Sequence, residues 1–284
     1  ATGDADLRPL WIALSRSADR GRRLFALGTL SEQAGAEAGE VFLDRFRNDP
    51  EPPLRAEALV HLIAHKLVDD ELLAEALAAD SQAVQCIAAR EHVRRGRAGA
   101  AIETLEQLTR SKDLATASLA RMSLLGLGRR QYLPDLEATL SDPAAAGRVT
   151  ELLMGQIREE RVAAAVPLAR RVAADQADAR IRAQAHQAVA AASEGGARAL
   201  AEAIAADESP IVRVQLLGAL AQREDAAESL KALAAGEDAL AALARFELAR
   251  RAGGDAPAGP AREALTTGHP IVIDYVLARV ADDR

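Results

Sequence analysis

Two histidines one helical turn apart have the types and spacing of metal ligands. His61 and His65 stand four residues apart, with Glu57 before and Asp69 after them, so all four would share one helical stripe. Zinc usually takes ligands that converge from more than one element, and the chain has no HExxH motif. We therefore expect a solvated polar stripe, and neither a metal nor another cofactor.

A local basic cluster is the second candidate. Arg90, Arg94, Arg95 and Arg97 lie beside Glu91, and guanidinium groups on one helix face could bind an anionic partner. The chain nevertheless has a formal net charge of -7, which favours pairing of these arginines with nearby carboxylates. The same charge argues against a nucleic-acid partner, because such proteins usually present a basic face.

No catalytic constellation accompanies these residues. The single cysteine, Cys86, stands beside Ile87 on a segment that must pack, so we expect an inert structural thiol. The sequence shows no Ser-His-Asp arrangement, no phosphate-binding glycine loop and no paired carboxylates in a supporting context. It therefore predicts that the chain is not an enzyme and has no catalytic residue.

The elements that would position these side chains form an internal repeat. Residues 197–208 predict an amphipathic helix, Ser209 and Pro210 predict a turn, and a second amphipathic helix follows. The same order recurs at intervals of roughly 28 to 33 residues, which divides the chain into about nine helical hairpins. The second helices are expected to begin near Arg22, Leu54, Val84, Ala115, Arg148, Ile181, Val212, Leu240 and Val272.

Three copies share a finer pattern, in which a turn aspartate precedes a helix arginine by six residues and a leucine follows by four. The pairs are Asp49 and Arg55, Asp142 and Arg148, and Asp207 and Arg213.

This pattern resembles the HEAT repeat family in its short bacterial form, as in the bilin-lyase-type HEAT-like group. The resemblance covers nearly the whole chain. It implies a right-handed α-solenoid in which the turn aspartates and helix arginines form a hydrogen-bonded ladder between neighbouring repeats. Arg182 also occupies the arginine position, whereas Gln85, Thr116, Ala241 and Ile273 depart from it.

The composition favours the same architecture. Hydrophobic residues make up 49% of the 284 residues, yet aromatic residues make up only 2%. Alanine has the highest helix propensity and lets helices approach closely, but it fills a thick core poorly. We therefore predict an all-α fold, a single domain over residues 1–284 built as a thin two-layer stack, and no transmembrane segment.

The concave surface of such a stack suits a protein or peptide partner. We expect a non-catalytic binding scaffold, in the bacterial cytoplasm unless a leader was removed before Ala1, in which case a periplasmic or secreted location is open. The alternatives are a HEAT-like enzyme or enzyme subunit (bilin lyase-like or, less favoured, DNA-base-excising) and a structural assembly subunit. The expected partner-binding residues are solvent-facing on the second helices: His61, His65, Arg94, Arg95, Gln156, Gln187, Arg245 and Arg279.

Overall fold

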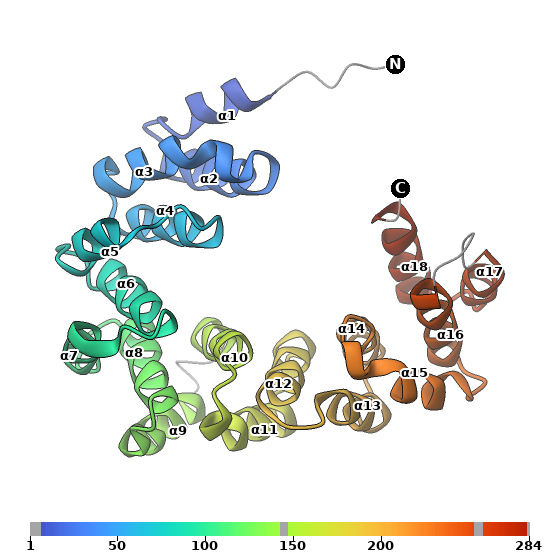
Figure 1. The fold of residues 1–284 in the computed structure, drawn as a ribbon. Coiled ribbons are helices and arrows are strands. Elements are labelled where there is room, and N and C mark those ends of the chain that lie inside the picture. The colour runs from blue at the N-terminus through green and yellow to red at the C-terminus, as the bar shows by residue number, and fades with distance from the viewer. Residues whose placement is uncertain (1–6, 143–146, 253–257, 283–284) are drawn as a thin grey trace. The chain divides into compact units, whose positions relative to one another are not determined.

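The fold is all-helical, as the sequence predicts. The computed structural model describes residues 7–142, 147–252 and 258–282. These residues form eighteen α-helices, joined in places by short 3-10 turns, and no strand occurs among them (Figure 1). The chain divides into two compact units, Ala1–Leu124 and Leu125–Arg284.

The first unit contains seven complete helices and most of an eighth, α8, which spans the division between the units. Their bounds are α1 (Arg8–Leu14), α2 (Arg20–Gln33), α3 (Gly39–Asn48), α4 (Pro52–Ala64), α5 (Asp70–Leu77), α6 (Gln82–Arg94), α7 (Ala98–Leu108) and α8 (Leu114–Gly126). A 3-10 turn, η1 (Gly35–Ala38), joins α2 to α3.

The second unit contains the remaining ten helices. Their bounds are α9 (Leu133–Ser141), α10 (Arg148–Glu160), α11 (Val166–Asp175), α12 (Ala179–Ala192), α13 (Gly196–Ala206), α14 (Pro210–Ala221), α15 (Ala227–Ala234), α16 (Ala239–Ala252), α17 (Ala258–Thr266) and α18 (Pro270–Asp282). Three 3-10 turns precede α9, α11 and α15, namely η2 (Arg130–Tyr132), η4 (Ala163–Ala165) and η5 (Glu224–Ala226).

The even-numbered helices correspond to the predicted second helices, and each begins at the predicted residue or one or two residues before it. The early starts have a local cause. Asp19 and Asp178 cap the first turns of α2 and α12 through backbone N–H groups, and Pro52 and Pro210 are the first residues of α4 and α14. Caps and first-turn prolines start a helix without adding to its apolar periodicity.

Within each unit, most even-numbered helices pack against the preceding odd-numbered helix and against the next even-numbered one. In the first unit α2 contacts α4, and α4 contacts α6; in the second, α10, α12, α14, α16 and α18 follow one another in the same way. Fully buried alanines such as Ala58, Ala88, Ala185 and Ala244 lie on these helices. Small side chains at these positions allow the close approach of neighbouring helices.

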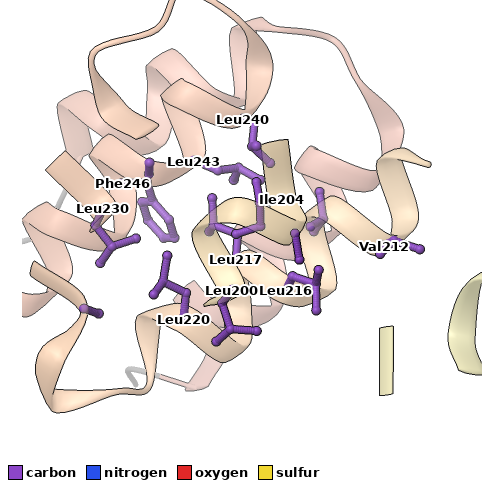
Figure 2. Close-up of a cluster of buried hydrophobic side chains, with 14 of the residues drawn as sticks. Leu200, Ile204, Val212, Leu216, Leu217, Leu220, Leu230, Leu240, Leu243 and Phe246 are labelled. Carbon is purple, nitrogen blue, oxygen red and sulfur yellow. The ribbon is translucent and has the colours of Figure 1, made fainter. Parts of the chain in front are cut away.

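Larger apolar side chains fill the remaining space of each unit. In the first unit, Phe42, Leu59 and Leu73 are fully buried in one cluster. In the second, side chains of α13, α14, α15 and α16 point toward one another, with Leu217 and Phe246 near the centre (Figure 2). Burial of each such side chain contributes about 1.5–3 kcal/mol, so these clusters hold the helix surfaces in fixed positions.

Candidate binding surface

Arginines of the even-numbered helices are joined to aspartates of the following helix pair. Arg23 donates from Nε to Asp49 Oδ2 over 2.9 Å and from Nη2 to Oδ1 over 3.3 Å, and both side chains are buried. Arg182 makes the same two bonds with Asp207, over 2.9 and 3.2 Å. The partners stand 26 and 25 residues apart, so each bond joins one helix pair to the next.

Arg55 and Arg213 continue this ladder in a more exposed form. Arg55 donates to Asp80 over 2.9 Å, and Arg213 donates to Asp238 over 3.2 Å. Both aspartates are at least half exposed. Each arginine also donates to a backbone carbonyl of its own helix pair, that of Asp49 for Arg55 and that of Ile204 for Arg213.

Each ladder arginine therefore bonds the side chain of an aspartate in the following helix pair, and not that of the aspartate six residues before it. Asp49 and Asp207 accept from the arginine of the preceding pair, and Arg55 reaches only the backbone carbonyl of Asp49. Arg23, Asp80 and Asp238 were missed by the sequence reasoning, although they recur at the same interval along the chain. Asp142 and Arg148 flank residues 143–146, which lie outside the described residues.

A second recurring position lies on each even-numbered helix, six residues after the position of the ladder arginine, whether or not an arginine stands there. We call it the sixth position. It carries titratable groups in several helices and apolar or small side chains in the others. Adjacent sixth positions can meet, because Arg279 Nε lies 3.7 Å from Glu247 Oε1. From α2 to α18 the series reads Thr29, His61, Glu91, Met122, Met154, Ala188, Ala219, Glu247 and Arg279.

His61 of α4 and His65, which directly follows α4, pack against an aromatic ring and do not form an exposed stripe. The rings of His61 and His65 lie 5.2 and 6.0 Å from that of Phe42. His65 Nε2 is 2.8 Å from the hydroxyl of Ser31, and His61 Nε2 is 3.5 Å from Glu57 Oε1. Burial lowers the pKa of His61, although Glu57 opposes this shift. Both side chains thus contribute to the packing of α2, α3 and α4.

Glu91 organises the basic cluster of α6. Glu91 is a buried residue, 4% exposed. Its carboxylate accepts hydrogen bonds from Arg94 over 2.6 and 2.9 Å and from Arg95 over 2.6 Å. Burial alone would raise the pKa of Glu91, but these hydrogen bonds outweigh it, and the pKa is lowered. Arg95 also donates to the carbonyl of Val68, whereas Arg94 remains 61% exposed. Asp70 pairs with Arg97 and lies 3.8 Å from Arg95.

Glu247 organises a corresponding cluster in the second unit. Its buried carboxylate accepts from the hydroxyl of Tyr275 over 2.7 Å and from Arg250 over 3.1 Å. Arg251, one residue further along α16, donates to the carbonyls of Ala221 and Arg223 over 2.7 and 2.8 Å. Both clusters share the pattern Glu-x-x-Arg-Arg, in which the second arginine reaches back to the preceding helix pair. This repeated pattern is the signal that could have identified Glu247 from the sequence.

Tyr275 brings α18 into the Glu247 cluster. A Cβ atom at Gly218 of α14 would lie 3.1 Å from the tyrosine ring and 3.3 Å from its hydroxyl, so the glycine leaves room for the ring to pack there. Burial, reinforced by the charge of Glu247, raises the pKa of Tyr275 far above its ordinary value. The phenol therefore remains protonated and serves as a hydrogen-bond donor.

The remaining predicted binding residues have different surroundings. Gln156 is 2% exposed and donates to Glu160, so burial excludes it from a solvent-facing stripe. Gln187 is half-buried and accepts from Arg158 over 3.3 Å. Arg245 donates to Glu263 and to the carbonyls of Ala234, at the end of α15, and of Gly236 in the following turn. The structure therefore brings Arg94 and Arg95 together around one carboxylate, and His61 and His65 together against Phe42, and it leaves Gln156, Gln187, Arg245 and Arg279 in separate contacts.

Three further findings concern metal ligands, the cysteine and membrane spans. No group of three or more His, Cys, Asp or Glu side chains among the described residues is arranged to hold a metal ion. Cys86 is buried, and its sulfur lies 3.9 Å from the carbonyl oxygen of Thr116. In the part of the chain that the structure describes, no helix is both long and apolar enough to cross a membrane.

No family model matches the chain, and neither a curated protein nor a solved structure matches it. The resemblance to HEAT repeats therefore rests on the residues of this chain alone.

Proposed function

We propose that the chain is a HEAT-like, right-handed α-solenoid of nine helical hairpins that acts as a non-catalytic scaffold for a protein or peptide partner. The observation that carries the proposal is the arrangement of the even-numbered helices within each unit. They pack on one another in series, and among the described residues ladder bonds join four of the helix pairs to the pair that follows. On this constant frame, the sixth position and its neighbours change in charge from helix to helix.

Exposed arginines three or four residues after the sixth position are the expected contact residues of the even-numbered helices. Arg94 is held by Glu91 but keeps 61% of its side chain exposed, and Arg158 of α10 is 45% exposed. A guanidinium group held in place by a buried carboxylate loses less conformational entropy on binding than a free one. Arginine is also enriched among the residues that dominate protein interfaces.

A capture experiment with charge-reversed variants tests this proposal. The purified chain would be incubated with bacterial lysate, and bound proteins would be compared between wild type, Arg94→Glu and Arg158→Glu. The matched control is Arg198→Glu on α13, an odd-numbered helix, where the side chain is 86% exposed. Circular dichroism would verify that each variant is folded.

If the scaffold proposal is correct, wild type and the Arg198→Glu control should capture the same protein. At least one of the Arg94→Glu and Arg158→Glu variants should fail to capture it. The purified partner should then bind the chain directly, with the same order of affinities. Equal capture by all four proteins would remove the binding site from the even-numbered helices. Direct binding of no protein at all would overturn the scaffold function.

A further inference from the structure

A small pocket beside Glu247 collects positive charge. Its volume is about 230 Å³, and it is lined by Ala221, Gln222, Glu247, Arg250, Arg251 and Arg279. Three guanidinium groups face one carboxylate, so the lining carries a formal surplus of two positive charges. This surplus is unusual in a chain whose net charge is -7, and like charges gathered in a concave site attract an oppositely charged ligand.

Each of the three arginines is held by at least one contact with the protein. Glu247 holds Arg250, and the carbonyls at the end of α14 hold Arg251. Arg279 lies with its Nε 3.4 Å from the hydroxyl of Tyr275 and 3.7 Å from Glu247. A guanidinium group has five N–H donors, and the contacts of Arg279 with Tyr275 and Glu247 are made through one nitrogen. The anchored groups are thus arranged in advance of any ligand, which lowers the entropic cost of binding.

We propose that this pocket, between the end of α14 and helices α16 and α18, binds a phosphate group. A phosphate group carries about 1.5 to 2 negative charges near neutral pH, which comes close to the surplus charge of the lining. Its oxygens can accept from several guanidinium groups at once, and arginine is well suited to such bidentate contacts. A carboxylate carries one charge and neutralises only half of the surplus. Mutual repulsion of Arg250, Arg251 and Arg279 also decreases when a dianion lies between them.

The inference goes beyond the scaffold function and does not depend on it, because inorganic phosphate alone can serve as the probe. The phosphate can be free or carried by a phosphorylated protein segment. These sources share the same chemistry at the pocket, and a peptide containing phosphoserine, compared with its unphosphorylated form, distinguishes them.

Isothermal titration calorimetry of the full chain with inorganic phosphate, at constant ionic strength set by sodium chloride, tests the proposal. Wild type should show saturable binding at one site in the millimolar range or below. Arg279→Gln and Arg250→Gln should each weaken binding roughly tenfold or more, as expected for loss of a charge-assisted hydrogen bond. The control, Arg198→Gln on α13, removes the same charge from an exposed position and should bind phosphate like wild type.

A conservative variant keeps the test decisive if a glutamine variant unfolds. Arg279→Lys retains the positive charge but loses the planar set of donors, so it should remain folded and bind phosphate several-fold more weakly. Wild-type affinity in a folded Arg279→Lys or Arg279→Gln protein would overturn the proposal. So would the absence of saturable phosphate binding by wild type, or an equal loss of affinity in Arg198→Gln. Tighter binding of the phosphoserine peptide than of free phosphate would identify a phosphorylated partner as the source.

Discussion

The Glu91 and Glu247 clusters use the same local pattern but perform different structural tasks. In both, a buried glutamate holds an arginine three residues later, and the next arginine donates to a carbonyl of the preceding helix pair. The clusters differ at the sixth position of the following even-numbered helix, which is Met122 after Glu91 and Arg279 after Glu247. Two side chains of α18, Tyr275 and Arg279, thus tie a second helix to the carboxylate of Glu247, whereas Glu91 holds the arginines of its own helix.

The charge balance of the two clusters differs accordingly. Around Glu91, Asp70 pairs with Arg97 and lies near Arg95, so carboxylates offset most of the positive charge. Around Glu247, the pocket collects three arginines against one carboxylate. A repeated frame therefore fixes where charged side chains can stand, while changes at single positions determine the net charge of each site.

Loss of the central carboxylate should have the largest effect and should separate the clusters. Glu247→Gln weakens contacts between α16 and α18 and leaves Arg250 and Arg279 without their buried counter-charge. The free energy of unfolding should therefore fall by about 2 kcal/mol. Glu91→Gln affects mainly contacts within α6 and should cost about 1 kcal/mol. Hydrogen exchange would measure this difference, with faster exchange spreading to α18 only in Glu247→Gln. Equal losses without an effect on α18 would contradict the distinction.

The tyrosine that joins α18 to the Glu247 cluster should have the next largest effect. Tyr275→Phe removes the hydroxyl that donates to Glu247 and retains the ring, so unfolding by urea should require about 1 kcal/mol less free energy. Tyr132→Phe is the matched control at the other tyrosine of the chain and should change stability less. A neutral Tyr275→Phe substitution would show that the ring alone joins the two helices.

The second arginine of each pattern should contribute similarly in both units. Arg95→Gln and Arg251→Gln each remove donation to carbonyls of the preceding helix pair, with an expected cost of about 1 kcal/mol or less in either case. Chemical denaturation of both variants under identical conditions would compare them. A large inequality would mean that the shared sequence pattern does not correspond to a shared structural role.

The smallest expected effect is a dependence on pH of the stability that Glu91 contributes. The pKa of Glu91 is lowered in the folded protein from an ordinary value of 4.5, so its ionised form adds stability above that pH. This contribution is lost as the pH falls below 4.5 toward the folded-state pKa. The stability difference between wild type and Glu91→Gln should therefore shrink on acidification, as measured by urea denaturation across this range. A difference that stays constant with pH would exclude a contribution from Glu91 ionisation.

Much of the helical architecture could be predicted because apolar periodicity reports helix faces directly. The predicted starts near Leu54 and Val212 lie within two residues of the first residues of α4 and α14, and the recurring arginine is visible in the sequence alone. The partners were not predictable from spacing within a hairpin, because Arg182 bonds an aspartate 25 residues later. The Glu247 cluster does not follow from apolar periodicity, because that pattern places a glutamate on a solvated helix face. In the structure the carboxylate of Glu247 is buried.

The ladder has a mechanical consequence. Each bond of the Arg23–Asp49 type joins only one helix pair to the next, so a stretching force loads these bonds in series and the weakest breaks first. A unit under tension should therefore extend in steps, each releasing one helix pair. About 30 residues at roughly 3.4 Å per extended residue correspond to about 100 Å of added length per step. The buried Arg23–Asp49 bond should resist longer than the exposed Arg55–Asp80 bond, which would give the steps unequal rupture forces.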